Sequence, residues 1–220
     1  VCSPAAQIVP HSAAGRIAAT LEAEAVLAAA GHLHVMGSGL PVPAVFSIVR
    51  NALPAIKARG GTVSFDPNIR KEMLTAGDAK AAFDMVLAAT DYLLPSGEEL
   101  QLVTGESDET RAVERLLDAG VREIVLKRGA EGASHFDRNG RTDIAGFAVE
   151  EIDPTGAGDC FGAAFLVCRR LGKSVEDSLR YANAAGARTV TVRGPMEGAS
   201  TFAELDAFIA ATTKRPEASS

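Results

Sequence analysis

The sequence alternates short runs of strand type with longer runs of helical periodicity along almost its whole length. Each expected strand is short and apolar, and each expected helix carries apolar positions three and four residues apart. This alternation predicts an α/β protein with a doubly wound, mostly parallel sheet and helices on both of its faces. The expected strands cover residues 32–36, 62–65, 92–94 and 123–127, and the expected helices cover residues 22–30, 44–59, 79–89, 98–103 and 109–119.

One segment departs from this alternation. Residues 133–137 and 141–144 read as strands and flank Asn139-Gly140, a pair that favours a two-residue hairpin turn. We therefore expect an antiparallel hairpin at one edge of the otherwise parallel sheet. No linker-like composition interrupts the chain, so residues 1–220 are expected to form a single domain, with a frayed tail from residue 214.

Polar and glycine-rich clusters directly follow the expected strands, where ligands bind in open parallel sheets. In the cluster at residues 66–70, Arg70 can hold a carboxylate, a phosphate or a sugar hydroxyl through its planar fork, and Asn68 can orient a phosphate or a metal-bound water. The alternative is an ordinary Asp-Pro turn with a surface salt bridge. The sequence leaves both interpretations open.

Two further clusters have a structural and a functional interpretation. Lys127 and Arg128 precede Gly129 at the end of a strand, which suits nucleotide phosphates but also a solvated loop. Ser96 and Glu99 have the spacing of a helix capping box, which explains both residues without function. The functional alternative is that Glu99 binds a water of a Mg²⁺ ion, because Mg²⁺ keeps several waters.

Residues 152–162 carry the strongest functional signal: Ile-Asp-Pro-Thr-Gly-Ala-Gly-Asp-Cys-Phe-Gly. The helix that follows is almost wholly apolar over residues 160–168, so we expect it to be buried on every side. The N-terminus of such a helix has unpaired N–H groups and a positive dipole, and it binds anions, usually phosphate. Asp159 lies in the first turn, where it suits a general base. The alternative is that the glycines permit tight packing and Asp159 completes a cap.

Composition excludes several classes of partner. Lys and Arg total 22 against 28 Asp and Glu, which gives a formal charge of −6 without any long basic run, so nucleic acid and anionic membranes are poor partners. No apolar run is long enough to span a bilayer. The three cysteines are too few for a disulfide framework, which predicts a reducing, cytoplasmic location.

Together these clusters resemble the ribokinase, or pfkB, family of carbohydrate kinases. Residues 153–162 are similar to the C-terminal signature of that family, and the Asp66-x-Asn68-x-Arg70, Glu99 and Lys127-x-Gly129-x-x-Gly132 clusters precede it in the family's order. The resemblance covers about the last three quarters of the chain. It implies ATP-dependent phosphorylation of a sugar hydroxyl, with ATP and Mg²⁺ and, in some members, K⁺.

The resemblance also implies a role for individual residues. Asp159 would be the catalytic base that activates the sugar hydroxyl, and the backbone of Gly156, Ala157 and Gly158 would form the anion hole. The other implied contacts are those of Asn68, Lys127, Gly129, Gly132 and Asn183 with the nucleotide, of Arg70 and Asp159 with the sugar, of Glu99 with Mg²⁺ through water, and of Asp153 and Thr155 with a monovalent cation.

The sequence departs from the family pattern at three points. Ser96 stands where the family usually has Asn, and complete members are longer, so their N-terminal strand and lid are expected to be missing here. Members often dimerise through that lid, which predicts a homodimer for a full-length protein. The layout is most similar to 2-keto-3-deoxygluconate kinases and fructokinase-like members. Pro195 stands about where the former tend to carry an acidic substrate contact, which weakens the assignment to a keto acid.

The substrate therefore stays open between a ketohexose and a 2-keto-3-deoxy sugar acid. Two alternatives also remain: a kinase for a nucleoside or a sugar phosphate, and a non-catalytic nucleotide-binding regulator on the same fold.

Overall fold

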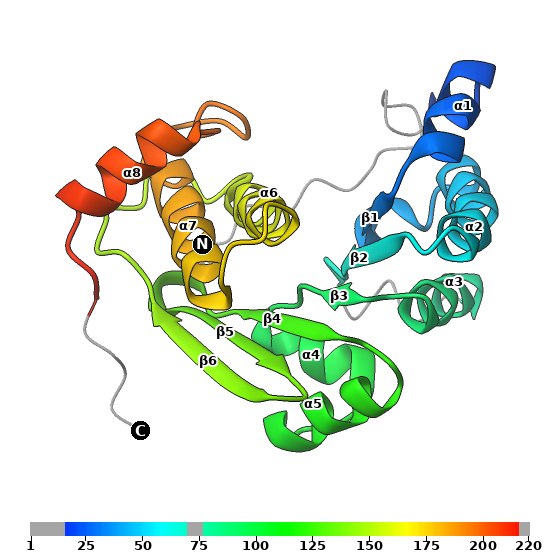
Figure 1. The fold of residues 1–220 in the computed structure, drawn as a ribbon, viewed down its shortest axis with the longest axis horizontal. Coiled ribbons are helices and arrows are strands. Elements are labelled where there is room, and N and C mark those ends of the chain that lie inside the picture. Colours follow the sequence, from blue (N-terminus) through cyan, green and yellow to red (C-terminus); the bar gives the residue numbers. More distant parts are fainter. Residues whose placement is uncertain (1–15, 70–76, 216–220) are drawn as a thin grey trace. The chain divides into compact units, whose positions relative to one another are not determined.

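The computed structural model describes residues 16–69 and 77–215 of the chain, and Arg70 lies outside them. The chain forms two compact units, Val1–Ile124 and Val125–Ser220 (Figure 1). The prediction of one domain over the whole chain stays a prediction.

The first unit is built on parallel strands, as predicted, and their order in the sheet is β1-β2-β3-β4. Helices separate these strands along the chain, which is the connection that parallel pairing requires. The strands are β1 (His32–Met36), β2 (Thr62–Asp66), β3 (Tyr92–Leu93) and β4 (Glu123–Lys127), and the helices are α1 (Leu21–Ala29), α2 (Pro43–Ala58), α3 (Gly77–Ala88), α4 (Gly97–Thr104) and α5 (Glu109–Asp118).

A buried carboxylate ties together the amino-terminal ends of strands in the first unit. Asp91, which precedes β3, accepts a hydrogen bond of 2.8 Å from the backbone N–H of Val63 in β2. Its carboxylate also pairs with Lys57 Nζ at 2.8 Å and with Arg122 Nε at 3.1 Å. The Asp91 side chain is only 3% exposed, whereas both cations reach solvent.

The second unit contains the end of β4 and the predicted antiparallel hairpin of β5 (Gly132–Asp137) and β6 (Gly140–Ala145), which are followed by α6 (Ala157–Arg170), α7 (Val175–Thr189) and α8 (Phe202–Ala211). The two-residue turn lies one position earlier than expected, because Gly140 pairs with Asp137 and belongs to β6. The Asp137 carboxylate accepts hydrogen bonds from the N–H groups of Asn139 and Gly140, which stabilises this register.

The prediction that the helix after residue 159 is buried on every side is wrong. Asp159, Ala163 and Val167 lie on an exposed side of α6, and Val167 is 46% exposed. The opposite side, with Phe161 and Phe165, is buried. Small apolar side chains tolerate exposure, so an apolar composition alone does not require burial on all sides.

None of the helices within the described residues combines the length and apolarity that a membrane crossing needs.

Candidate active site

The turn before α6 requires glycine at position 156 because of packing. Gly156 is the N-cap of α6 and has a left-handed backbone with φ of 82°. A Cβ there would lie 2.2 Å from the carbonyl oxygen of Pro195, in the loop after α7. Any side chain at this position would therefore be strained and would push the loop away. For Gly156, the structure therefore agrees with the alternative in which the glycine permits tight packing.

Gly158 is different, because packing does not explain it. It lies in the first turn of α6 and is exposed, and a Cβ there would meet only Lys127 Nζ, at an ordinary contact distance of 3.9 Å. A helical glycine is less stable than alanine by up to about 1 kcal/mol. The absence of a side chain leaves the backbone of the helix tip open, which is typical of a position where a ligand approaches closely.

Lys127 adds a positive charge to this helix tip. It is the last residue of β4, and its Nζ reaches the side of Gly158. The N–H groups of the first helical turn and the helix dipole favour an anion at the same place. The tip of α6 and Lys127 together have the positive charge and the open backbone that suit a phosphate group.

Asp159 follows at the same tip and is open to solvent. Within residues 16–69 and 77–215, its carboxylate forms neither a hydrogen bond nor an ion pair. The alternative interpretation, in which the Asp159 side chain caps the helix, is therefore not supported, because α6 has no side-chain cap hydrogen bond. An exposed carboxylate beside an anion site can accept a proton from a hydroxyl group that approaches the bound anion.

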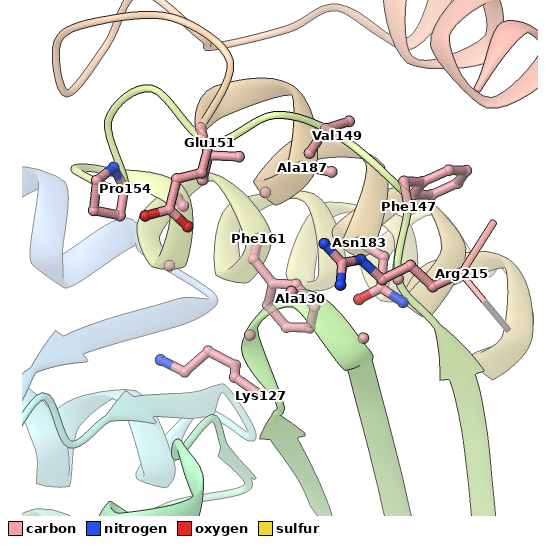
Figure 2. Close-up of a pocket in the computed structure, with 17 residues that line it drawn as sticks. Lys127, Ala130, Phe147, Val149, Glu151, Pro154, Phe161, Asn183, Ala187 and Arg215 are labelled. Carbon is pink, nitrogen blue, oxygen red and sulfur yellow. The ribbon is translucent and has the colours of Figure 1, made fainter. Parts of the chain in front are cut away.

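A pocket of about 240 Å³ in the second unit begins at this helix tip (Figure 2). It brings together residues of the strand end, the hairpin, α6 and α7 that the sequence assigned to nucleotide binding. These residues are Lys127, Gly129, Gly132 and Asn183, and they are joined by Ala157 and Gly158 of the predicted anion hole. Gly156 and Asp159 flank the tip but do not line the pocket.

Sequence reasoning missed other lining residues, among them Phe147, Val149 and Arg215. Phe147 and Val149 lie in an irregular segment without a motif. The sequence predicted a frayed tail from residue 214, but Lys214 forms a β-bridge with Phe147, so residues 214 and 215 are not frayed. No local pattern in the sequence indicates this pairing.

Asn183 is 6% exposed and holds α7 against the end of β6. Its side-chain amide donates hydrogen bonds to the carbonyl oxygens of Ile144 at 2.9 Å and Ala145 at 3.3 Å. Both donors of the amide group are therefore engaged by the backbone. Its Oδ1 is the polar atom that it can offer to a molecule in the pocket.

Asp153 ties the turn before α6 to the loop after α7. Its Oδ1 accepts a hydrogen bond from the N–H of Thr155, and its Oδ2 accepts one from the N–H of Gly194, each at 3.0 Å. Hydrogen bonds from the side chain and backbone of Thr155, and then from Gly194, lower the pKa of the Asp153 carboxyl below its ordinary value. The predicted cation-binding role of Asp153 and Thr155 stays a prediction.

In the first unit, Glu99 fixes the loop that follows β2. Its Oε1 accepts a hydrogen bond from the N–H of Ile69 at 3.0 Å, and its Oε2 accepts one from the N–H of Ser96 at 2.6 Å. Asn68, in the same loop, has a left-handed backbone with φ of 41°. The capping box is confirmed, while the contact of Glu99 with Mg²⁺ through water stays a prediction. The described residues contain no group of three acidic, His or Cys side chains arranged to hold a metal ion.

The parallel sheet, the edge hairpin and the open helix tip define an α/β protein of the ribokinase-like class. The chain belongs to the pfkB family of carbohydrate kinases, whose family model matches residues 8–201. It is 29% identical over 184 residues to a fructokinase from Vibrio alginolyticus, covering 80% of this chain and 60% of the relative. It is also 29% identical over 188 residues to a 2-dehydro-3-deoxygluconokinase from Bacillus subtilis, covering 83% and 57%.

Solved structures show the same likeness. An Escherichia coli protein that carries the provisional name ribokinase II, in complex with ATP and Mg²⁺, is 45% identical with a TM-score of 0.82, covering 85% of this chain and 61% of that one. A fructokinase from Vibrio cholerae O395, bound to fructose, ADP and calcium, is 30% identical with a TM-score of 0.72, covering 81% and 60%. The chain thus spans about 60% of the length of these relatives.

Proposed function

We propose that this protein is an ATP-dependent carbohydrate kinase that phosphorylates a hydroxyl group of a small sugar. The observation that carries the proposal is the tip of α6, where Gly158 lacks a side chain, Lys127 supplies a positive charge and Asp159 presents an open carboxylate. Such a tip suits a phosphoryl group on one side and a proton acceptor on the other. Family membership supports the same chemistry.

The lining of the pocket is of the kind that would bind a nucleotide. Lys127 and the N–H groups of Gly156 and Gly158 would hold its phosphates, and the apolar part of the lining suits the nucleoside. The N–H of Ala157 donates instead to the carbonyl oxygen of Pro154 at 3.3 Å. Mg²⁺ would supply positive charge on the phosphates, and it needs few protein ligands because it keeps several waters.

In the proposed phosphoryl transfer, different residues of this chain have different roles. Asp159 accepts the proton of the attacking sugar hydroxyl, which makes the oxygen a better nucleophile. Lys127 and the α6 tip stabilise the negative charge of the transferred group, which is the main contribution that proteins make to this reaction. The roles of Asn68, Arg70 and Glu99 remain those implied by the family resemblance.

The substrate class is a ketohexose or a 2-keto-3-deoxy sugar acid. The fructokinase and the 2-dehydro-3-deoxygluconokinase are equally similar to this chain, which supports both sugars. We further expect a cytoplasmic protein whose partners are ATP and the sugar, and a homodimer when it is full-length.

The test is a coupled assay of ADP release over ketohexoses, sugar acids, ribose and nucleosides, run beside the Asp159→Asn variant. We expect release that depends on one sugar class and that the variant loses. A preference for a nucleoside or a sugar phosphate would replace the proposed substrate. ADP binding without release on any acceptor would favour the non-catalytic regulator.

A further inference from the structure

The segment after α8 returns to the pocket and pairs with the chain that follows β6. The carbonyl oxygen of Thr213 accepts a hydrogen bond of 2.9 Å from the N–H of Ala148, and the N–H of Arg215 donates one of 2.8 Å to the carbonyl oxygen of Gly146. Between them, Lys214 and Phe147 form an antiparallel bridge. This pairing fixes the backbone of Arg215 at the edge of the pocket.

The side chain of Arg215 lines the pocket, while that of its neighbour Lys214 does not. Figure 2 draws Arg215 on the same side of the pocket as Asn183 and Phe147, away from Lys127. Within the described part of the chain, the guanidinium group of Arg215 has neither a hydrogen bond nor an ion pair. Its donors are therefore available to a molecule in the pocket.

Because Lys127 and the α6 tip mark the phosphate end, the opposite end would receive the nucleoside. Asn183 cannot donate hydrogen bonds there, since its amide donors are held by the carbonyl oxygens of Ile144 and Ala145. A purine base has acceptor nitrogen atoms as well as an aromatic face, and a planar guanidinium group suits both. Lys127 lies at the other end of the pocket and is occupied with the phosphates.

We propose that Arg215 contacts the base of a bound purine nucleotide, which makes the segment 213–215 part of the nucleotide site. The inference rests on the proposed function and adds to it a residue that recognises the nucleoside. Arg215 acts through the planar shape and directed donors of its guanidinium group, and not only through its charge.

The test is calorimetric titration of the whole chain with ADP and Mg²⁺, comparing Arg215→Ala, Arg215→Lys and the matched control Lys214→Ala. Losing a charged donor contact weakens binding by about tenfold or more. We expect this loss for Arg215→Ala, little recovery for Arg215→Lys, and affinity within about twofold of the parent for Lys214→Ala. Equal melting temperatures of the variants would show that folding is unchanged.

Two results would overturn the inference: an Arg215→Ala variant that binds ADP as the Lys214→Ala variant does, or full recovery by Arg215→Lys, which would leave only an effect of charge. Failure of the parent chain to bind ADP would count instead against the proposed function.

Discussion

Lys127 and Gly158 meet at the tip of α6, where a Cβ added to the glycine would lie 3.9 Å from the lysine Nζ. This distance leaves room for a methyl group when the site holds no anion. A phosphate bound as proposed, between the ammonium group and the helix backbone, would compete with a methyl group for this space. At position 158, alanine would therefore favour the helix, whereas the proposed phosphate binding would favour glycine.

Gly158→Ala should separate these two demands. We expect the free energy of unfolding to stay equal or rise by up to about 1 kcal/mol, because alanine is the better helix former. Phosphoryl transfer should slow on the order of a hundredfold, as when one oxyanion donor is lost. Urea denaturation and the coupled assay measure the two effects. Gly97→Ala, in open space at the start of α4, is the control; equal activity of both variants would contradict the role of the tip.

Gly156→Ala should instead destabilise the protein. The left-handed backbone costs a non-glycine residue about 1–2 kcal/mol, and the contact with the Pro195 carbonyl adds to that. We expect a loss of about 2 kcal/mol or more in the free energy of unfolding, measured by urea denaturation. A variant with the same free energy of unfolding as the parent would contradict this, because it would mean that the loop after α7 can move away from the added methyl group without loss of stability.

Asp159→Asn removes the proton acceptor but keeps the size of the side chain. We expect turnover to fall by at least about a hundredfold while the chain still binds ADP, because the carboxylate lies beside the phosphate site and not in the pocket lining. The coupled assay and calorimetry report the two quantities. Full activity in the variant would refute the proposed base.

The carboxyl of Asp153 should make stability depend on acid pH. Its folded-state pKa lies below its ordinary value of 3.8, so its contribution is present above that value. The contribution is lost as the pH falls through the lower folded-state pKa. Urea denaturation of the parent and of Asp153→Asn over a series of acid pH values should show a difference in stability that shrinks as the pH falls. A constant difference would contradict the linkage.

Asp91→Ala should lower the free energy of unfolding considerably, although the ion pairs of Asp91 with Lys57 and Arg122 contribute little to it. The substitution leaves the buried N–H of Val63 without its acceptor, which costs about 1–3 kcal/mol. Arg122→Ala, which removes an exposed partner, should cost at most about 1 kcal/mol. The comparison is made by urea denaturation, and equal losses in the two variants would mean that the ion pair, not the backbone contact, carries the stability.

Local sequence signals predicted most of the elements. The bounds of β1 and β4 agree with the expected ranges, because short apolar runs between turn residues leave few alternatives. The capping box of Ser96 was also visible from spacing alone. The hairpin was predicted with its turn one residue late, because the carboxylate of Asp137 selects the register and its contacts cannot be read from the Asn-Gly pair.

The parts of the site that depend on contacts distant in sequence could not be predicted. The amide group of Asn183 is held by β6, which lies far away along the chain. The sequence did not predict that one side of α6 is exposed, because an apolar composition does not indicate which sides of a helix pack against other elements. Gly156 and Gly158 look equivalent in the sequence, and only the position of Pro195 distinguishes the glycine that packs from the one that leaves space.

The turn before α6 meets the loop after α7 at two points: Gly156 packs against the main chain of Pro195, and the side-chain carboxylate of Asp153 accepts a hydrogen bond from the N–H of Gly194. On the loop side, both contacts are made by main-chain atoms, and the side chain of Met196 in the same loop is 77% exposed. An exposed side chain such as that of Met196 could therefore be exchanged, for example to change which sugar is accepted, without disturbing the helix tip. An insertion or deletion in the same loop would instead shift the tip itself, so redesign is constrained by loop length and by the glycines at 194 and 198, where a side chain would be strained or would clash.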